Sequence, residues 1–297
     1  IDPADPNKLT PEEQDIIDGL VSSFRRSEKL QIHTRFLYSV GSIYRRHNGN
    51  LLYHGCIPCD GNGEFMEFSL YSDTPLKGRA FLDWADRLAR QGYFAPDGSM
   101  ERLRGLDFLW FLWCGRNSPI CGRAKITTFE RALIEDKASY TEPKNPYYVY
   151  YGSEEFCRRI LDDFDLHKPW SRIINGHMPV KVKEGEDPRK GGGRLVVIDG
   201  GFCKAYHKQT GIAGYTMFFS SHGMRIAAHE PFTTREEAIH GKKDITSHSF
   251  IVENLPRRLM ISDTDAGEGI KRRIEDLNAL LDAYRSGIIK TDSTGRI

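Results

Sequence analysis

The sequence has no long hydrophobic run, no excess of charge of either sign and few cysteines. Its longest uncharged apolar run is residues 108–114, far shorter than the ~18 residues that a membrane-spanning helix needs. The 42 Lys and Arg against 41 Asp and Glu leave a net charge of +1, so no bulk field attracts nucleic acid or an anionic membrane. Six cysteines in 297 residues exclude a disulfide scaffold and indicate reduced thiols in a cytoplasmic protein.

An initiator Met and a signal peptide are also missing. The chain opens Ile1-Asp2-Pro3-Ala4-Asp5-Pro6, with neither a positive segment nor an apolar one after it. With 297 residues, 39% of them hydrophobic, the chain is long enough to bury a substantial core. We therefore expect a globular chain that is either processed or a piece of a longer protein.

Residues 1–50 are predicted to form a helical lead-in. Thr10 is a suitable N-cap, and Glu13 completes a capping box with it. Apolar residues follow at helical spacing, and a second apolar stripe over residues 36–44 continues this pattern. The break at Asn48-Gly49-Asn50 is expected to end the helix.

Downstream the pattern changes to short apolar runs that end at Gly, His or Asp, which is typical of buried strands in an α/β protein. Helical segments lie between these runs, and a hairpin is predicted over Ser221-His222-Gly223. The expected divisions are a main domain over 51–266, a C-terminal helix over 267–290 and a polar tail over 291–297.

Two histidines stand where predicted strands end. His54 directly follows Leu51-Leu52-Tyr53, and His177 follows Ile173-Ile174-Asn175-Gly176. Side chains at strand ends build sites in α/β proteins because the sheet fixes the backbone there. A lone histidine in such a place is more often structural, whereas two in matching contexts could share one metal ion. Both interpretations stay open on the residues alone.

Several motifs add a specific resemblance. Tyr53-His54-Gly55-Cys56-Ile57-Pro58 is similar to the His-Gly-Gly motif of calcineurin-like metallophosphoesterases, and Asn175-Gly176-His177-Met178-Pro179 to their later Gly-His motif. Leu112-Trp113-Cys114-Gly115-Arg116-Asn117-Ser118-Pro119 stands where phosphoprotein phosphatases have Leu-Trp-Ser-Asp-Pro. With further stretches, the chain from about Leu9 to Lys290 resembles the bacterial class 3 fructose-1,6-bisphosphatases; these stretches are 108–119, 127–131, 144–148, 198–206 and 210–216.

The resemblance implies an α/β fold, namely the second half of a calcineurin-like metallophosphoesterase β-sandwich flanked by helices. Members of this family are about twice as long and carry Asp-x-His, Gly-Asp-x-x-Asp-Arg and Gly-Asn-His motifs upstream. None of these motifs occurs before His54. The resemblance therefore implies a C-terminal part of a larger enzyme.

For that enzyme the resemblance implies hydrolysis of fructose 1,6-bisphosphate to fructose 6-phosphate and phosphate, a step of gluconeogenesis. The residues matching His54 and His177 ligate the second metal of a two-metal centre in the superfamily, with Mn²⁺ as the expected ion. The other ligands and the general acid belong upstream, so no catalytic residue is assigned to this chain. We expect the chain alone to be inactive and to bind metal weakly or not at all.

Phosphate groups need cationic partners, and Arg binds them in a bidentate manner. Each basic residue near the motifs is more often a solvated surface charge, but four are candidates for substrate binding: Arg116, Arg123, Lys125 and Lys204. Two further polar residues at strand ends, Asp199 and Asn175, are candidates for orienting an imidazole.

Other functions remain as alternatives. One is a related metallophosphoesterase that acts on a protein or a nucleotide. Another is a module for oligomerisation or effector binding, suggested by the helical lead-in and by the basic start of the last helix. The resemblance also implies a homo-oligomer and phosphoenolpyruvate or AMP as effector. Cys56-Ile57-Pro58-Cys59 lacks the second cysteine pair of a zinc ribbon and the helix start of a redox motif, so neither function is expected there.

Overall fold

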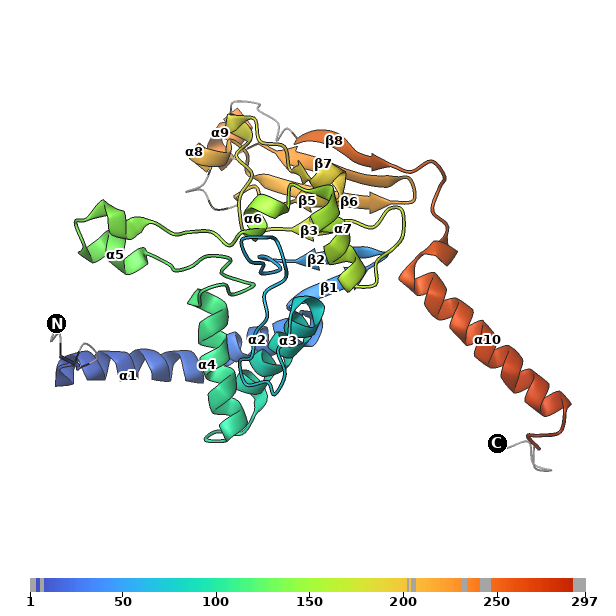
Figure 1. Cartoon of the computed structure of the whole chain (residues 1–297), viewed down its shortest axis with the longest axis horizontal. Helices are drawn as coiled ribbons and strands as arrows, with labels where there is room; N and C mark the ends of the chain where they lie inside the picture. The colour runs from blue at the N-terminus through green and yellow to red at the C-terminus, as the bar shows by residue number, and fades with distance from the viewer. Residues whose placement is uncertain are drawn as a thin grey trace. The chain divides into compact units, whose positions relative to one another are not determined.

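The computed structural model describes residues 4–5, 8–201, 203, 207–230, 234–240 and 247–290 (Figure 1). The chain divides into two compact units, Ile1–Ser42 and Ile43–Ile297. Lys204, one of the candidate substrate-binding residues, and the predicted tail 291–297 lie outside the described residues.

The first unit consists of two helices, α1 (Pro11–Arg26) and α2 (Glu28–Val40). The capping box predicted for α1 is confirmed, because the Thr10 hydroxyl accepts from the Glu13 backbone while the Glu13 carboxylate accepts from the Thr10 backbone. Neither helix contains a buried residue.

The second unit contains two sheets and the remaining helices. Its strands are β1 (Tyr44–His47), β2 (Asn50–Tyr53), β3 (Ile173–Asn175), β4 (Arg189–Lys190), β5 (Leu195–Val197), β6 (Gly214–Ser220), β7 (Gly223–His229) and β8 (Ser247–Asn254). Its α-helices are α3 (Gly78–Phe94), α4 (Met100–Cys114), α5 (Thr128–Leu133), α6 (Tyr147–Tyr150), α7 (Glu154–Asp163), α8 (His207–Thr210), α9 (Arg235–His240) and α10 (Asp265–Arg285). Single 3₁₀ turns are η1 (Lys137–Tyr140), η2 (Val182–Glu184), η3 (Gly191–Gly193) and η4 (Ile261–Asp263).

The larger sheet has the strand order β1-β2-β3-β5-β4. Its three central strands are parallel, with Leu51 opposite Ile173 and Ile173 opposite Leu195. These strands are buried, as their continuous apolar sequences predict. Helix α7 packs on this sheet through the apolar side chains of one face, while α3 and α4 lie side by side (Figure 1).

Strand β1 corrects the expected helical lead-in of residues 1–50. Helix α2 ends at Val40, and Tyr44–His47 form an edge strand antiparallel to β2. Asn48 and Gly49 have φ angles of 50° and 81°, the left-handed conformations that a two-residue hairpin turn requires. The Asn-Gly pair therefore turns a hairpin and does not end a helix.

The smaller sheet has the order β6-β7-β8 and is antiparallel throughout. The hairpin predicted between its first two strands is confirmed, with Ser220 opposite Gly223. The two sheets are joined by a largely buried ion pair between Arg172, directly before β3, and Glu253 of β8. A mixed α/β architecture with two sheets is thus confirmed, whereas the calcineurin-like sandwich stays a prediction.

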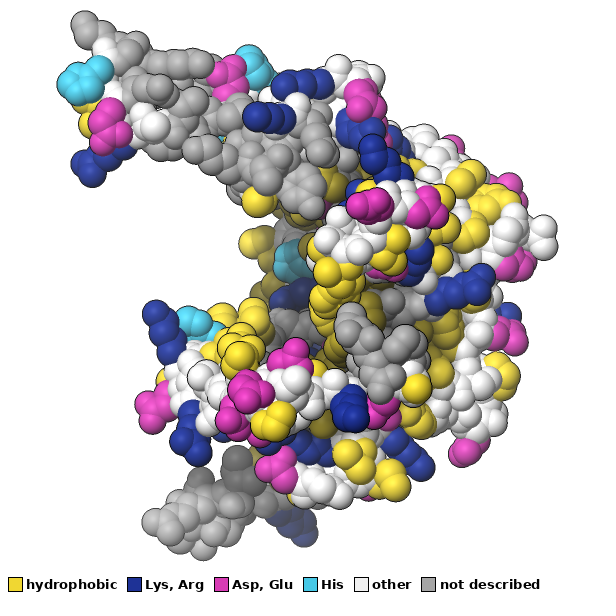
Figure 2. Space-filling model, turned by 90° about the vertical axis from the view of Figure 1, so that its left-hand side faces the viewer, with side chains coloured by type: hydrophobic (Ala, Val, Ile, Leu, Met, Phe, Trp, Pro, Cys, Tyr) yellow, Lys and Arg dark blue, Asp and Glu magenta, His cyan; other side chains and the backbone are white. Residues whose placement is uncertain are grey.

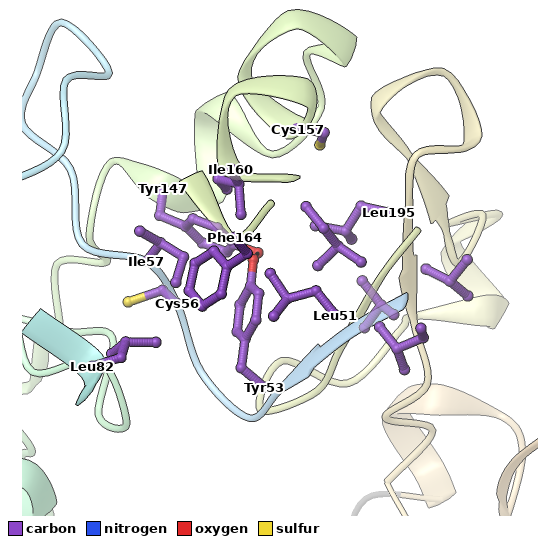
Figure 3. Packing of buried hydrophobic residues seen from close by; sticks show 14 of the residues in the cluster. Leu51, Tyr53, Cys56, Ile57, Leu82, Tyr147, Cys157, Ile160, Phe164 and Leu195 are labelled. Atoms are coloured by element: carbon purple, nitrogen blue, oxygen red, sulfur yellow. Dashed lines mark hydrogen bonds between the residues drawn. The ribbon is translucent and has the colours of Figure 1, made fainter. Parts of the chain in front are cut away.

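One hydrophobic cluster takes in residues of both sheets and of helices α3, α4, α6 and α7. In its centre Tyr53 of β2 and Tyr147 of α6 point toward one another (Figure 3), and their hydroxyl oxygens lie 2.7 Å apart. Burial raises the pKa of both phenols well above the ordinary value. The pair therefore stays protonated and closes its own hydrogen bond inside the core.

Several helices carry large apolar side chains that remain exposed. Among these side chains are Leu103, Leu106, Trp110 and Trp113 on α4, and Ile270, Ile274, Leu277 and Leu281 on α10. Figure 2 shows apolar side chains interspersed with charges of both signs on the face it presents. Helix α10 begins two residues before the predicted 267, and Asp265 in its first turn exchanges two hydrogen bonds with Asn48. Among the described helices, none combines the length and the apolar character needed to cross a bilayer.

Candidate functional site

The two strand-end histidines meet at one edge of the larger sheet. Strand β2 pairs in parallel with β3, with Tyr53 opposite Asn175, so the residues that follow these two strands leave the sheet together. The Nε2 atom of His54 lies 3.0 Å from Nδ1 of His177. The two rings are edge-to-face, with their centroids 5.0 Å apart.

The orientation of His177 is fixed by its backbone and by a carbonyl group. Its φ angle is 66°, in the left-handed region that non-glycine residues seldom adopt. Its Nε2 atom lies 2.8 Å from the carbonyl oxygen of Cys121. Because a carbonyl only accepts, Nε2 carries the proton, and the Nδ1 lone pair of His177 points at His54.

Burial lowers the pKa of both imidazoles. For His54, the negative charge of Asp199 opposes this effect. For His177, the neighbouring His54 and Arg123 lower the pKa further, while the bond to Cys121 and the charge of Asp199 act in the opposite direction. Both rings are therefore neutral at pH 7, which is the form that binds metal ions.

The two nitrogens suit two positions around a shared ion. Because His54 Nε2 and His177 Nδ1 lie 3.0 Å apart, both would be able to bind the same divalent ion. A third donor is missing from this arrangement, since within the described ranges no three His, Cys, Asp or Glu side chains are grouped to hold a metal. The donor set present in this chain thus fits part of a metal site.

Asn175 and Asp199 were expected to orient an imidazole, but neither forms a hydrogen bond with a histidine ring of the site. Asn175 is buried, and its Nδ2 donates to the carbonyl oxygens of Gly55 (2.6 Å) and His54 (3.3 Å). It therefore holds the backbone that carries His54 and does not touch the ring. The Asp199 carboxylate accepts from the backbone of Gly201 at 2.9 Å and reaches the imidazoles only through its charge.

Of the described basic candidates, Arg123 lies closest to the histidines. Its Nη2 is 3.4 Å from the sulfur of Met178, and its guanidinium forms an ion pair with Glu142. The Nζ atom of Lys125 instead donates to the Ser139 carbonyl oxygen at 2.8 Å. Neither group bonds to His54 or His177. Arg116 is exposed, and no side chain among the described residues pairs with it.

The loop from 115 to 125 packs tightly against the strand end at His54. The backbone N–H of Cys56 donates to Pro119 O at 2.8 Å, and a Cβ on Gly55 would lie only 2.1 Å from that oxygen. The absence of a side chain at Gly55 is therefore what permits this close approach. The same loop supplies the Cys121 carbonyl, a partner of His177 that sequence reasoning missed because any residue has such a carbonyl.

The cysteine pair in this region is buried and inert. Cys56 and Cys59 are free thiols. Burial raises the pKa of Cys59 to about 12 and that of Cys56 further. Both thiols are therefore protonated at neutral pH, and neither a zinc thiolate nor a reactive redox pair forms readily in this environment.

Comparison with known proteins places the chain in one family. The model of the family described as Firmicute fructose-1,6-bisphosphatase matches residues 1–286. The class 3 fructose-1,6-bisphosphatase of Clostridium botulinum (strain 657 / Type Ba4) is 50% identical over all 297 residues, and that of Clostridium novyi (strain NT) is 48% identical over 290 residues, or 98% of the chain. No solved structure matches the chain.

The match covers only part of each relative. The chain spans 44% of the length of both enzymes, so more than half of each relative has no counterpart here. The range matched by the family model, residues 1–286, contains both strand ends at which His54 and His177 meet. The chain therefore belongs to the Firmicute fructose-1,6-bisphosphatase family.

Proposed function

We propose that this chain is the C-terminal part of a metal-dependent phosphatase that hydrolyses fructose 1,6-bisphosphate to fructose 6-phosphate and phosphate. The observation that carries the proposal is the approach of the His54 and His177 nitrogens to 3.0 Å in a chain of this family. Clostridial relatives that bear the name fructose-1,6-bisphosphatase class 3 support the choice of substrate.

In this proposal, His54 Nε2 and His177 Nδ1 hold one divalent ion, with Mn²⁺ as the ion we expect. Such an ion would supply charge neutralisation for the phosphoryl group and an activated water. The chain contributes the orientation: Cys121 O fixes the proton of His177 on Nε2, and Asn175 holds the backbone of His54. In the structure, Nε2 of His54 donates its proton to the Nδ1 lone pair of His177. To bind a metal ion through Nε2, His54 would have to carry this proton on Nδ1 instead.

The remaining ligands and the general acid belong, in this proposal, to the part of the relatives that the chain does not span. Two imidazoles leave even a four-coordinate ion two ligands short. The chain alone should therefore show no bisphosphatase activity. Measurable hydrolysis of fructose 1,6-bisphosphate by the pure chain would contradict this division of the site.

A joined enzyme tests the proposal directly. Residues 1–297 would replace the matched stretch of the Clostridium botulinum enzyme, and the product would be assayed with fructose 1,6-bisphosphate, a phosphopeptide and a dinucleoside polyphosphate. We expect turnover of the sugar bisphosphate and a loss of at least tenfold in kcat for His177→Gln, because the ligand is removed. His222→Gln, on an exposed turn, is the control. Preference for either other substrate would overturn the proposal.

A further inference from the structure

Two basic residues face each other beside the histidines. The segments around Arg123 and Lys144 form an antiparallel bridge in which these two residues are direct partners. The bridge is closed by bonds from Ala124 N to Pro143 O (2.8 Å) and from Asn145 N to Gly122 O (2.9 Å). Arg123 and Lys144 are therefore the non-hydrogen-bonded pair, whose side chains share one face and approach most closely.

The positive charges of this pair are compensated unequally. Arg123 forms an ion pair with Glu142, whereas Lys144 has no ion-pair partner in the described part of the chain. Lys181 adds a third positive charge. Burial and the charges of Arg123 and Lys181 lower the pKa of Lys144, and the negative charge of Glu186 opposes them only in part. Like charges placed directly opposite each other on paired strands destabilise the fold.

Arg123 connects this pair with the histidines. Its guanidinium contacts Met178, the residue after His177, at 3.4 Å. Two residues before Arg123 in the same loop, the carbonyl oxygen of Cys121 lies 2.8 Å from Nε2 of His177. Arg123 thus contacts the residue next to His177 and is also the bridge partner of Lys144.

We propose that Lys144 and Arg123 form a phosphate clamp that holds the phosphate group of the sugar bisphosphate that is not hydrolysed. An anion between the two side chains would relieve their repulsion and would supply the partner that Lys144 lacks. The assignment of the anion to a sugar bisphosphate rests on the proposed function, whereas the clamp itself rests on the bridge geometry. Lys144 begins one of the stretches that carry the family resemblance, 144–148, but it is not among the four basic candidates named from the sequence.

The first test measures binding to the chain itself. The dissociation constant for fructose 1,6-bisphosphate would be determined by ³¹P NMR for the wild type and three variants. We expect Lys144→Gln to weaken binding about tenfold because a charged hydrogen bond is lost. Lys144→Arg keeps the charge and should bind within about twofold of the wild type. Lys137→Gln, which removes an exposed lysine of η1, should have no effect.

Equal binding by the wild type and Lys144→Gln, or no binding by the wild-type chain, would overturn the clamp. Weakening by Lys137→Gln to the same extent would also overturn it, because net charge alone would then explain the effect. Circular dichroism spectra of the variants would confirm that each is folded.

The second test uses the joined enzyme and separates the two phosphates. For Lys144→Gln we expect KM for fructose 1,6-bisphosphate to rise about tenfold with little change in kcat. Hydrolysis of p-nitrophenyl phosphate should not change, because this substrate has only the phosphate that reacts. An equal loss with both substrates would overturn the assignment of Lys144 to the second phosphate.

The two proposals fail in different ways. If the joined enzyme does not hydrolyse fructose 1,6-bisphosphate but the chain binds it through Lys144, the proposed function is wrong and the clamp stands. If hydrolysis occurs and Lys144→Gln changes neither KM nor the dissociation constant, the clamp is wrong and the function stands.

Discussion

His54 Nε2 lies 3.0 Å from His177 Nδ1 although 123 residues separate the two histidines. The parallel pairing of β2 with β3 brings them to one sheet edge, and the Cys121 carbonyl then fixes the proton on the far nitrogen of His177. The position of each ring therefore depends on the other ring and on the backbone of the loop that contains Cys121.

The first prediction concerns pH. The pKa of each histidine is lowered in the folded chain, mainly by burial, whereas an unfolded chain has the ordinary value of about 6.5. The unfolded state then binds more protons, so stability is full above pH 6.5 and falls as pH drops toward the folded pKa values. Urea unfolding between pH 5 and 7 would measure this slope.

The variant His54→Gln removes one titrating group and the neighbour that lowers the pKa of His177. We expect a shallower pH slope and a higher pKa for His177, read from its ring proton signals. In His222→Gln, at an exposed position, the signals of both site histidines should keep their midpoints. Midpoints at or above 6.5 in the wild type would contradict the prediction.

The second prediction concerns the contact between Gly55 and the loop that follows α4. A methyl group at Gly55 would lie 2.1 Å from Pro119 O and 2.8 Å from Ile120 O. We expect Gly55→Ala to destabilise the chain by about 2–3 kcal/mol, the usual cost of overpacking, and to shift the His177 ring signals. A Cβ at Gly61 would meet nothing within 4 Å, so Gly61→Ala should leave stability and spectra unchanged.

The sequence predicted the buried strands of the sheet better than its edge strand. The strand ends at His54 and His177 were predicted because buried parallel strands are continuously apolar and stop at polar residues. The helix expected through Tyr44 was wrong because short apolar spacings fit a four-residue edge strand equally well. Asn48-Gly49 is a strong hairpin signal, and its meaning became clear only from the pairing of β1 with β2.

Of the candidate site, the sequence predicted the two histidine side chains that follow strand ends, His54 and His177. Cys121 contributes a main-chain carbonyl, for which no residue type is diagnostic. Lys144 becomes notable only because a non-local bridge places it opposite Arg123. Arg123 was a candidate from its proximity to a motif, but its ion pair with Glu142 depends on the tertiary arrangement.

The third prediction concerns the ion pair between the sheets. The side chains of Arg172 and Glu253 are 12% and 16% exposed. Glu253→Gln would leave the guanidinium of Arg172 buried without a counter-charge, and we expect a loss of about 3 kcal/mol in the free energy of unfolding. Glu67→Gln breaks an exposed pair with Lys77 and should change stability by less than about 1 kcal/mol.

Urea unfolding of the double variant Arg172→Met with Glu253→Gln would show whether the loss comes from the unpaired charge. We expect it to be more stable than Glu253→Gln alone, because no buried charge remains. A double variant that is less stable than Glu253→Gln would contradict this explanation.

The fourth prediction concerns thiol reactivity. Cys203 is exposed, whereas Cys56, Cys59 and Cys157 are buried, and burial raises the pKa of Cys59 and Cys157 to about 12. We expect a disulfide reagent at pH 8 to modify Cys203 rapidly and these three cysteines only after denaturation. Peptide mapping by mass spectrometry would identify the modified residues. Rapid modification of Cys56 or Cys59, or their protection by added zinc, would contradict the prediction.

The parallel pairing of β2 with β3 also determines when the site can form during folding. Helices α3 and α4 pack on each other within a short stretch of chain, and such local contacts form early. Bringing His54 to His177 closes a loop of 123 residues, which costs about 4 kcal/mol of chain entropy. We therefore expect the imidazole pair to form late in folding, so that a partly folded chain can have helices α3 and α4 in place and still lack the site.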